Sequence, residues 1–166
     1  MAKAERKYLA HYLDAAFDMT YAATNYVRLG KDLEEFTVTL NPDVENKKNI
    51  LGESSTVHNG YEVSANADPF YYDYDDELSQ KVMDIAMARS TADTCKTTYV
   101  EVVLKPGEGD AAPTVVTAWR EDVLIIPTSY GGDTSGIQVP FSLHFDGNRV
   151  EGTFDISTKK FTANGL

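Results

Sequence analysis

Four acidic residues near the middle of the chain have a spacing that could bind calcium. Asp73, Asp75, Glu77 and Asp84 fall at positions 1, 3, 5 and 12 of the calcium-binding loop template. Position 6 of that template requires a glycine for its sharp turn, and Leu78 stands there. Acids at this point also suit the first turn of a helix, where the helix dipole favours negative charge. We therefore predict the start of a helix and no metal site.

A glycine-rich stretch, "SYGGDTSG" at 129–136, raises the possibility of a serine nucleophile. Ser135 and Asp133 lie within it, but the stretch lacks both the G-x-S-x-G elbow and the lysine of a phosphate-binding loop. Glycines at such positions permit the positive φ angles of a turn between strands. We predict a turn here, and no enzyme activity.

The remaining reactive side chains show no metal-binding or catalytic spacing. His11, His58 and His144 are far from one another and from Cys95 in the sequence, so we place each histidine on the surface or on a face of a sheet. Trp119 is predicted to lie in the core. No cofactor is indicated.

Length and charge narrow the class of protein. A chain of 166 residues is predicted to be a single domain, 1–166, and is long enough to need no disulfide, which its lone cysteine could not form internally. No apolar run suits a signal peptide or a membrane span. The net charge of −11, from 26 acids and 15 basic residues, argues against DNA binding through a basic face.

Hydrophobic spacing predicts mainly β structure in the first half. Residues 1–25 form an N-terminal arm whose pattern fits a helix or a strand. A strand, a turn and a second strand follow at 25–41. In that second strand Phe36, Val38 and Leu40 share one face, and the opposite, polar face carries Glu35, Thr37 and Thr39.

Two further signals come before the second half. Asn59-Gly60, between short β-prone runs, predicts the two-residue turn of a hairpin. Apolar residues at Leu78, Val82, Ile85 and Ala86 predict a helix over 76–89.

The second half reads as strands at 97–105, 114–127, 136–146 and 148–157, the last two joined by a tight turn at Asp146-Gly147. One-sided alternation in these strands predicts an antiparallel β-sandwich or barrel of two sheets with one flanking helix. Pro140 marks an edge or a bulge.

The polar segment "LNPDVENKKNILGES" at 40–54 is expensive to order within a monomer, because few apolar groups offset the lost backbone entropy. We therefore interpret 41–68 as an extended inter-subunit loop or hairpin, and we predict that residues 43–51 are mobile in the isolated monomer. Charges at Asp43, Glu45, Lys47 and Lys48 would set the register, and Ile50 and Leu51 would anchor the contact. The predicted contact residues are Asn41, Pro42, Asp43, Val44, Glu45, Asn46, Lys47, Lys48, Asn49, Ile50 and Leu51.

The order and spacing of four segments, 26–53, 68–85, 120–141 and 147–155, resemble the tail tube (major tail) proteins of long-tailed bacteriophages. The resemblance implies a virion protein, made and assembled in the host bacterial cytoplasm, that forms rings of six stacked into a tube. Genomic DNA would pass through the lumen without sequence-specific binding, past Glu35, Thr37 and Thr39. Other implied partners are the tape measure, terminator, and tail tip or baseplate proteins, with no membrane contact.

Two other classes of protein remain open. A stand-alone β-sandwich binding module for a carbohydrate or protein ligand would use the tyrosine-rich cluster at 70–74 as its platform and would be monomeric. A small hydrolase would use Ser135 or Asp133, and would need a base beside the nucleophile.

Overall fold

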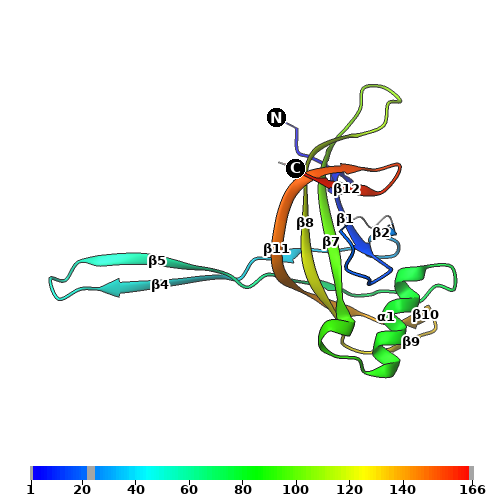
Figure 1. Ribbon diagram of the computed structural model, residues 1–166, viewed down its shortest axis with the longest axis horizontal. Helices are drawn as coiled ribbons and strands as arrows, with labels where there is room; N and C mark the ends of the chain where they lie inside the picture. The colour runs from blue at the N-terminus through cyan, green and yellow to red at the C-terminus, as the bar shows by residue number, and fades with distance from the viewer. Residues whose placement is uncertain (1, 22–24, 165–166) are drawn as a thin grey trace.

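A single antiparallel sheet of eight strands forms the body of the protein (Figure 1). The computed structural model describes residues 2–21 and 25–164, so residue 1, part of the predicted N-terminal arm (22–24) and the end of the predicted domain (165–166) lie outside the described residues. The strand order is β2–β1–β7–β8–β11–β6–β3, and β12 also pairs with β11. The predicted mainly β, antiparallel fold with one α-helix is confirmed, although one strongly curved sheet replaces two facing sheets.

The strands vary greatly in length, and the longest three form the centre of the sheet. These are β7 (Lys96–Lys105), β8 (Thr114–Pro127) and β11 (Phe141–Asp155). The shorter strands lie to either side and are β1 (Leu9–Asp14), β2 (Tyr26–Arg28), β3 (Val38–Thr39), β6 (Ser64–Ala67) and β12 (Lys160–Ala163).

The predicted tight turn at Asp146-Gly147 is wrong, because β11 passes through this point without reversing. Two register shifts against β8, around Gly147, absorb the residues as bulges. Gly147 and Asn148 have positive φ angles of 95° and 57°, which such bulges require. The bend lets one strand serve two partners, since the first part of β11 pairs with β6 and its end pairs with β12.

The N-terminal arm is a strand inside the sheet, preceded by a short 3-10 turn, η1 (Arg6–Tyr8). Every residue of β1 from Ala10 to Asp14 is buried. Burial on both faces places apolar residues at consecutive positions, which explains why the sequence pattern fitted a helix as well as a strand.

Each face of the sheet carries a hydrophobic core, and α1 (Glu77–Ala88) covers one of them. The helix was predicted correctly: Leu78, Val82 and Ile85 are buried, and the Asp76 carboxylate accepts a hydrogen bond from the Leu78 amide as an N-cap. The second core includes Tyr12, Tyr26 and Phe154 on the other face. No helix in the described part of the chain is long and apolar enough to cross a membrane.

The remaining short elements lie beside the helix. A small hairpin of β9 (Gly131–Asp133) and β10 (Gly136–Gln138) contains the glycine-rich stretch, and η2 (Ala92–Cys95) leads from the helix into β7. Gly131, Gly132 and Gly136 all have positive φ angles and lie in the two strands, so the turn itself falls at 134–135.

Candidate functional site

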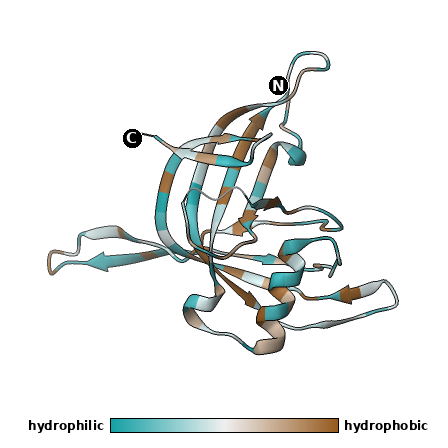
Figure 2. Ribbon diagram, turned by 45° about the vertical axis from the view of Figure 1, so that its right-hand side comes forward, coloured by the Kyte–Doolittle hydropathy of each residue, from teal (hydrophilic) through white to brown (hydrophobic). Residues whose placement is uncertain are grey.

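A two-stranded hairpin projects away from the body of the protein (Figure 1). Its strands are β4 (Pro42–Lys48) and β5 (Ser54–Tyr61), and they pair with no other strand in the described residues. Seven residues of strand correspond to a reach of about 23 Å at ~3.3 Å per residue. Nearly every side chain in the hairpin is exposed, and hydrophobic residues are sparse along it apart from the tip (Figure 2).

The hairpin confirms an extended segment over part of 41–68, but its turn is not at Asn59-Gly60. These two residues lie within β5, where Gly60 pairs with Asp43 beside a bulge. Gly60 has a φ angle of 133°, so the glycine serves the bulge and not the turn. Pairing continues from there to Lys48 opposite Ser54, which moves the turn to residues 49–53.

The side chain of Asn49 organises this turn. Its Oδ1 accepts hydrogen bonds from the amides of Leu51 and Glu53, at 2.9 and 3.0 Å, and its Nδ2 donates to the Glu53 carboxylate at 3.0 Å. Gly52 supplies the positive φ angle of 79°. Ile50 and Leu51 project from the turn with exposures of 103% and 76%. The tip is thus a shaped turn that presents two apolar side chains to solvent.

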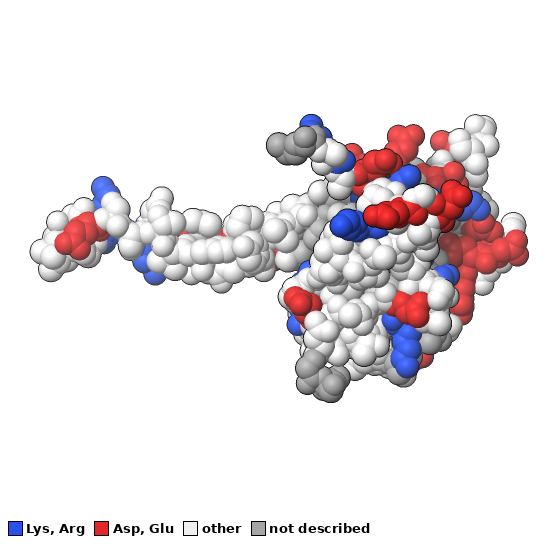
Figure 3. All heavy atoms as spheres, turned by 90° about the horizontal axis from the view of Figure 1, so that it is seen from above, with Lys and Arg blue, Asp and Glu red and all other residues white. Residues whose placement is uncertain are grey.

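Two of the charged residues that we predicted to set the register pair with each other in the single chain. Glu45 and Lys47 form an ion pair with each other at 3.1 Å within β4, so they are already partnered in the monomer. Three acids and two lysines lie between 42 and 61, which gives the hairpin a net charge of −1 out of the total of −11. Acidic residues accordingly gather on the body, and the hairpin is mostly uncharged (Figure 3). A nearly neutral arm can approach a second acidic body with little repulsion.

The three residues predicted to face a lumen lie around β3 at one end of the sheet. Glu35, Thr37 and Thr39 are exposed, and Phe36 between them is 6% exposed, as the alternation predicted. The predicted apolar face fails at Leu40, which is 52% exposed because the chain has already left the core to enter the hairpin.

A buried hydrogen-bonded chain on the sheet was not predicted. His11 was expected on the surface or on a sheet face; it does lie on the sheet, but is only 3% exposed. Burial and the charge of Arg6 lower the pKa of His11 from 6.5 to about 4, so its imidazole is neutral. Its Nε2 then accepts from Arg6 at 2.9 Å, and its Nδ1 donates to the Tyr99 hydroxyl at 2.5 Å. The Tyr99 hydroxyl donates to Glu101 at 3.1 Å.

Arg149 of β11 extends this chain across β8. Its guanidinium forms ion pairs with Glu101 and Glu121 and lies 4.8 Å from the ring of Trp119. Trp119 is therefore half-buried beneath an arginine and is not the core residue that we predicted. The network joins β1, β7, β8 and β11, so its role is to fix the central strands together.

The other residues that we considered as catalytic or metal-binding candidates make local contacts within the fold. The Asp73 carboxylate accepts from the Asp75 amide and pairs with Lys31 at 2.9 Å, and these contacts lower its pKa. The Asp133 carboxylate accepts from the Ser135 amide at 2.8 Å within the β9–β10 turn. His58 packs against Tyr61 on the hairpin.

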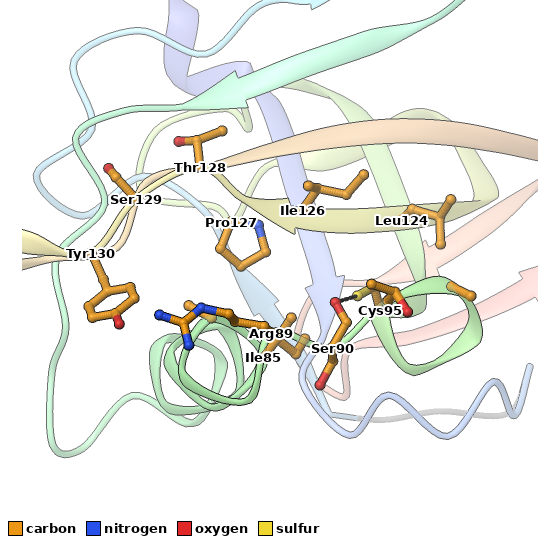
Figure 4. Close-up of a pocket in the computed structure, with 13 residues that line it drawn as sticks. Ile85, Arg89, Ser90, Cys95, Leu124, Ile126, Pro127, Thr128, Ser129 and Tyr130 are labelled. Carbon is orange, nitrogen blue, oxygen red and sulfur yellow. Dashed lines mark hydrogen bonds between the residues drawn. The ribbon is translucent and has the colours of Figure 1, made fainter.

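Two hollows lie on the body near α1. The larger, of about 870 Å³, is bordered by Tyr71, Tyr72 and Tyr74 and by the loop at 27–34. The smaller, of about 400 Å³, lies between the end of α1, η2 and the end of β8 (Figure 4).

The fold of this chain is similar to that of a protein in a solved structure. No family model and no curated protein sequence matches the chain. Its fold is similar to that of a chain in a cryo-EM structure of an extracellular contractile injection system, the PVC sheath–tube complex in its extended state. The TM-score is 0.53 at 11% identity, over 91% of this chain and 92% of the other. At this identity the likeness defines a shared fold.

Proposed function

We propose that this chain is a structural subunit of the tube of a tail-like particle, and specifically a bacteriophage tail tube protein. The observation that carries the proposal is the projecting hairpin, whose tip exposes Ile50 and Leu51 where a monomer gains nothing from them. An isolated two-stranded hairpin is only marginally stable in water. A neighbouring subunit that covers the tip would supply the missing burial. The fold shared with a chain of a sheath–tube complex supports this reading.

The assembly we propose is head-to-tail. A hairpin that leaves one side of the body and contacts a different surface of the next copy makes a heterologous contact, which closes into a ring or continues as a stack. The short strands β2, β3 and β12 provide further edges at the ends of the sheet. In the proposed particle six copies form each ring, the rings stack, and the tape measure, terminator and tail tip or baseplate proteins complete the tail.

The proposed conduit for DNA would be acidic. Six chains of net charge −11 carry −66 formal charges, and an acidic wall gives phosphates no cation to bind. Glu35, Thr37 and Thr39 are our candidates for residues on this wall. Glu35→Lys should leave folding intact and slow DNA ejection, with an effect that weakens at high salt. Equal ejection kinetics for both proteins at low salt would remove Glu35 from the lumen.

Electron microscopy of the purified protein over a range of concentrations tests the assembly. The wild type should form rings or tubes. A shortened variant, in which Asn-Gly replaces 46–56, should form neither, because it lacks the hairpin tip. Asn-Gly can join Glu45 to Val57 directly, since these two residues already face each other across the hairpin. The variant must keep the wild-type thermal unfolding of the body. A strictly monomeric wild type, together with its absence from tail tubes in intact particles, would contradict the proposal.

The 870 Å³ hollow favours the second candidate function, a monomeric binding module. Tyr71, Tyr72 and Tyr74 border it, and tyrosine rings are common at carbohydrate- and protein-binding surfaces. A glycan array probed with the shortened variant would detect such binding in the absence of assembly. Tyr72→Ala and Tyr74→Ala should then abolish it.

A further inference from the structure

The smaller hollow, between α1 and β8, has an apolar floor. Its walls come from three elements that meet at the end of the helix, and it remains open to solvent (Figure 4). Its volume of about 400 Å³ falls within the range of sites that hold compact ligands. The apolar residues that line it include Ile85, Ala86, Cys95, Leu124, Ile126 and Pro127.

The side chain of Arg89 places a positive charge at one end of this pocket. Arg89 is the C-cap of α1, and its backbone amide is fixed by hydrogen bonds to the carbonyls of Ile85 and Ala86. Its side chain is exposed and forms no ion pair or side-chain hydrogen bond within the described residues. Figure 4 shows the guanidinium on the Tyr130 side of the pocket, away from Cys95. The pocket therefore combines an apolar floor with one positive charge at its rim.

The hairpin tip is also apolar but carries the opposite charge. Ile50 and Leu51 are exposed apolar side chains on a turn that is held by Asn49. Glu53 follows two residues later, and its only ionic or hydrogen-bonded side-chain contact among the described residues is with the neutral amide of Asn49. The tip thus offers two apolar groups beside one carboxylate, which complements the pocket in both polarity and charge.

The two surfaces lie on opposite sides of the molecule. The hairpin projects from one side of the sheet, whereas α1 lies on the other (Figure 1). The tip therefore cannot reach the pocket of its own chain while the fold is intact. A second copy can supply the tip, and the same contact can then repeat from copy to copy.

We propose that the pocket between α1 and β8 receives the Ile50–Leu51 tip of a second copy of this chain, with Glu53 of the incoming tip paired to Arg89. The proposal rests on the proposed tube function and names the surface that the hairpin contacts. Desolvation of the two apolar side chains supplies most of the affinity, and the ion pair sets the register. Because Arg89 and Glu53 lie at the edge of the contact, salt should weaken their ion pair more than the apolar contact of Ile50 and Leu51.

A charge exchange tests the pairing in the full-length protein. Arg89→Glu and Glu53→Arg should each reduce assembly about tenfold or more, measured as the concentration at which half of the protein sediments as rings or tubes. The double variant should recover most of the wild-type value, since the pair is restored in reverse. Lys81→Glu, at an exposed position of α1 outside the pocket, makes the same charge change and should assemble as the wild type does. A folding defect cannot explain recovery in the double variant.

A disulfide trap locates the contact independently. In a Cys95→Ser background, Leu51→Cys protein mixed with Thr128→Cys protein should form a specific mixed dimer under mild oxidation, because Thr128 lies at the pocket. Thr162→Cys, on the exposed face of β12, should give none. Tubes without this dimer and without charge rescue would overturn the pocket proposal and leave the tube function standing. If the wild type forms no rings, the disulfide experiment still tests the contact, and failure to form the mixed dimer would overturn it.

Discussion

His11 should make the stability of the fold sensitive to acid. The buried imidazole has a pKa of about 4, against 6.5 for an exposed histidine. Between these two values the unfolded chain binds a proton at His11 and the folded chain does not. The stabilisation is therefore present above pH 6.5 and is lost as the pH falls toward 4. A shift of this size corresponds to about 3 kcal/mol when it is fully expressed.

The contribution can be isolated with His11→Asn. The asparagine amide can still donate to the Tyr99 hydroxyl, in place of Nδ1, but it does not titrate. Between about pH 7.5 and about pH 4.5, the wild type should lose about 2.5 kcal/mol more of its free energy of unfolding than the variant does. Carboxylates titrate over the same range in both proteins, so the comparison cancels them.

Urea unfolding followed by circular dichroism, at concentrations where the protein is monomeric, measures the four free energies. NMR titration of the His11 ring protons gives the folded-state pKa directly. Equal losses of stability in the two proteins, or a ring that titrates near 6.5, would show that burial and the charges of Arg6 and Arg28 do not hold the imidazole neutral.

Three further changes test local structure. Gly152→Ala should destabilise the body by about 1–3 kcal/mol in urea unfolding, because the new Cβ would lie 2.2 Å from the Thr162 carbonyl oxygen; an unchanged midpoint would contradict the β11–β12 packing. Asp76→Ala should cost about 1 kcal/mol through loss of the cap on the Leu78 amide, and Asp76→Asn should cost less. Asn49→Ala should leave thermal unfolding of the body unchanged and speed hydrogen exchange of the tip amides in the monomer; if exchange does not change, the side chain does not hold the turn.

The sequence predicted the elements whose pattern is local. The limits of β8 and of the helix follow from apolar spacing and from the cap at Asp76. Two turn predictions failed for a shared reason. Asn59-Gly60 and Asp146-Gly147 have the composition of two-residue turns, yet both are bulges within strands. A glycine with positive φ serves a turn or a bulge equally well, and the choice depends on where the partner strand ends.

The site was harder to predict than the fold. The extended segment was identified from its polarity, but the sequence could not decide between a loop and a hairpin, because the Asn49 side-chain contacts that close the turn leave no pattern in composition. The predicted mobility of 43–51 in the monomer remains a prediction, and the paired strands give it a definite measurement in amide exchange. The His11–Tyr99 contact joins residues 88 positions apart, so local periodicity could not reveal it.

The proposed assembly function would also account for the lack of catalytic and metal-binding motifs in this sequence. Catalysis requires particular atoms at fixed distances, and such requirements leave motifs. A contact between copies requires only that an apolar tip match an apolar pocket and that one charge meet its opposite, which many residue pairs can satisfy. Ile50, Leu51 and Glu53 on one surface and Arg89 on another form no motif in sequence. They become related only when two molecules are considered together, which is why the charge exchange between Glu53 and Arg89 tests more than either residue alone.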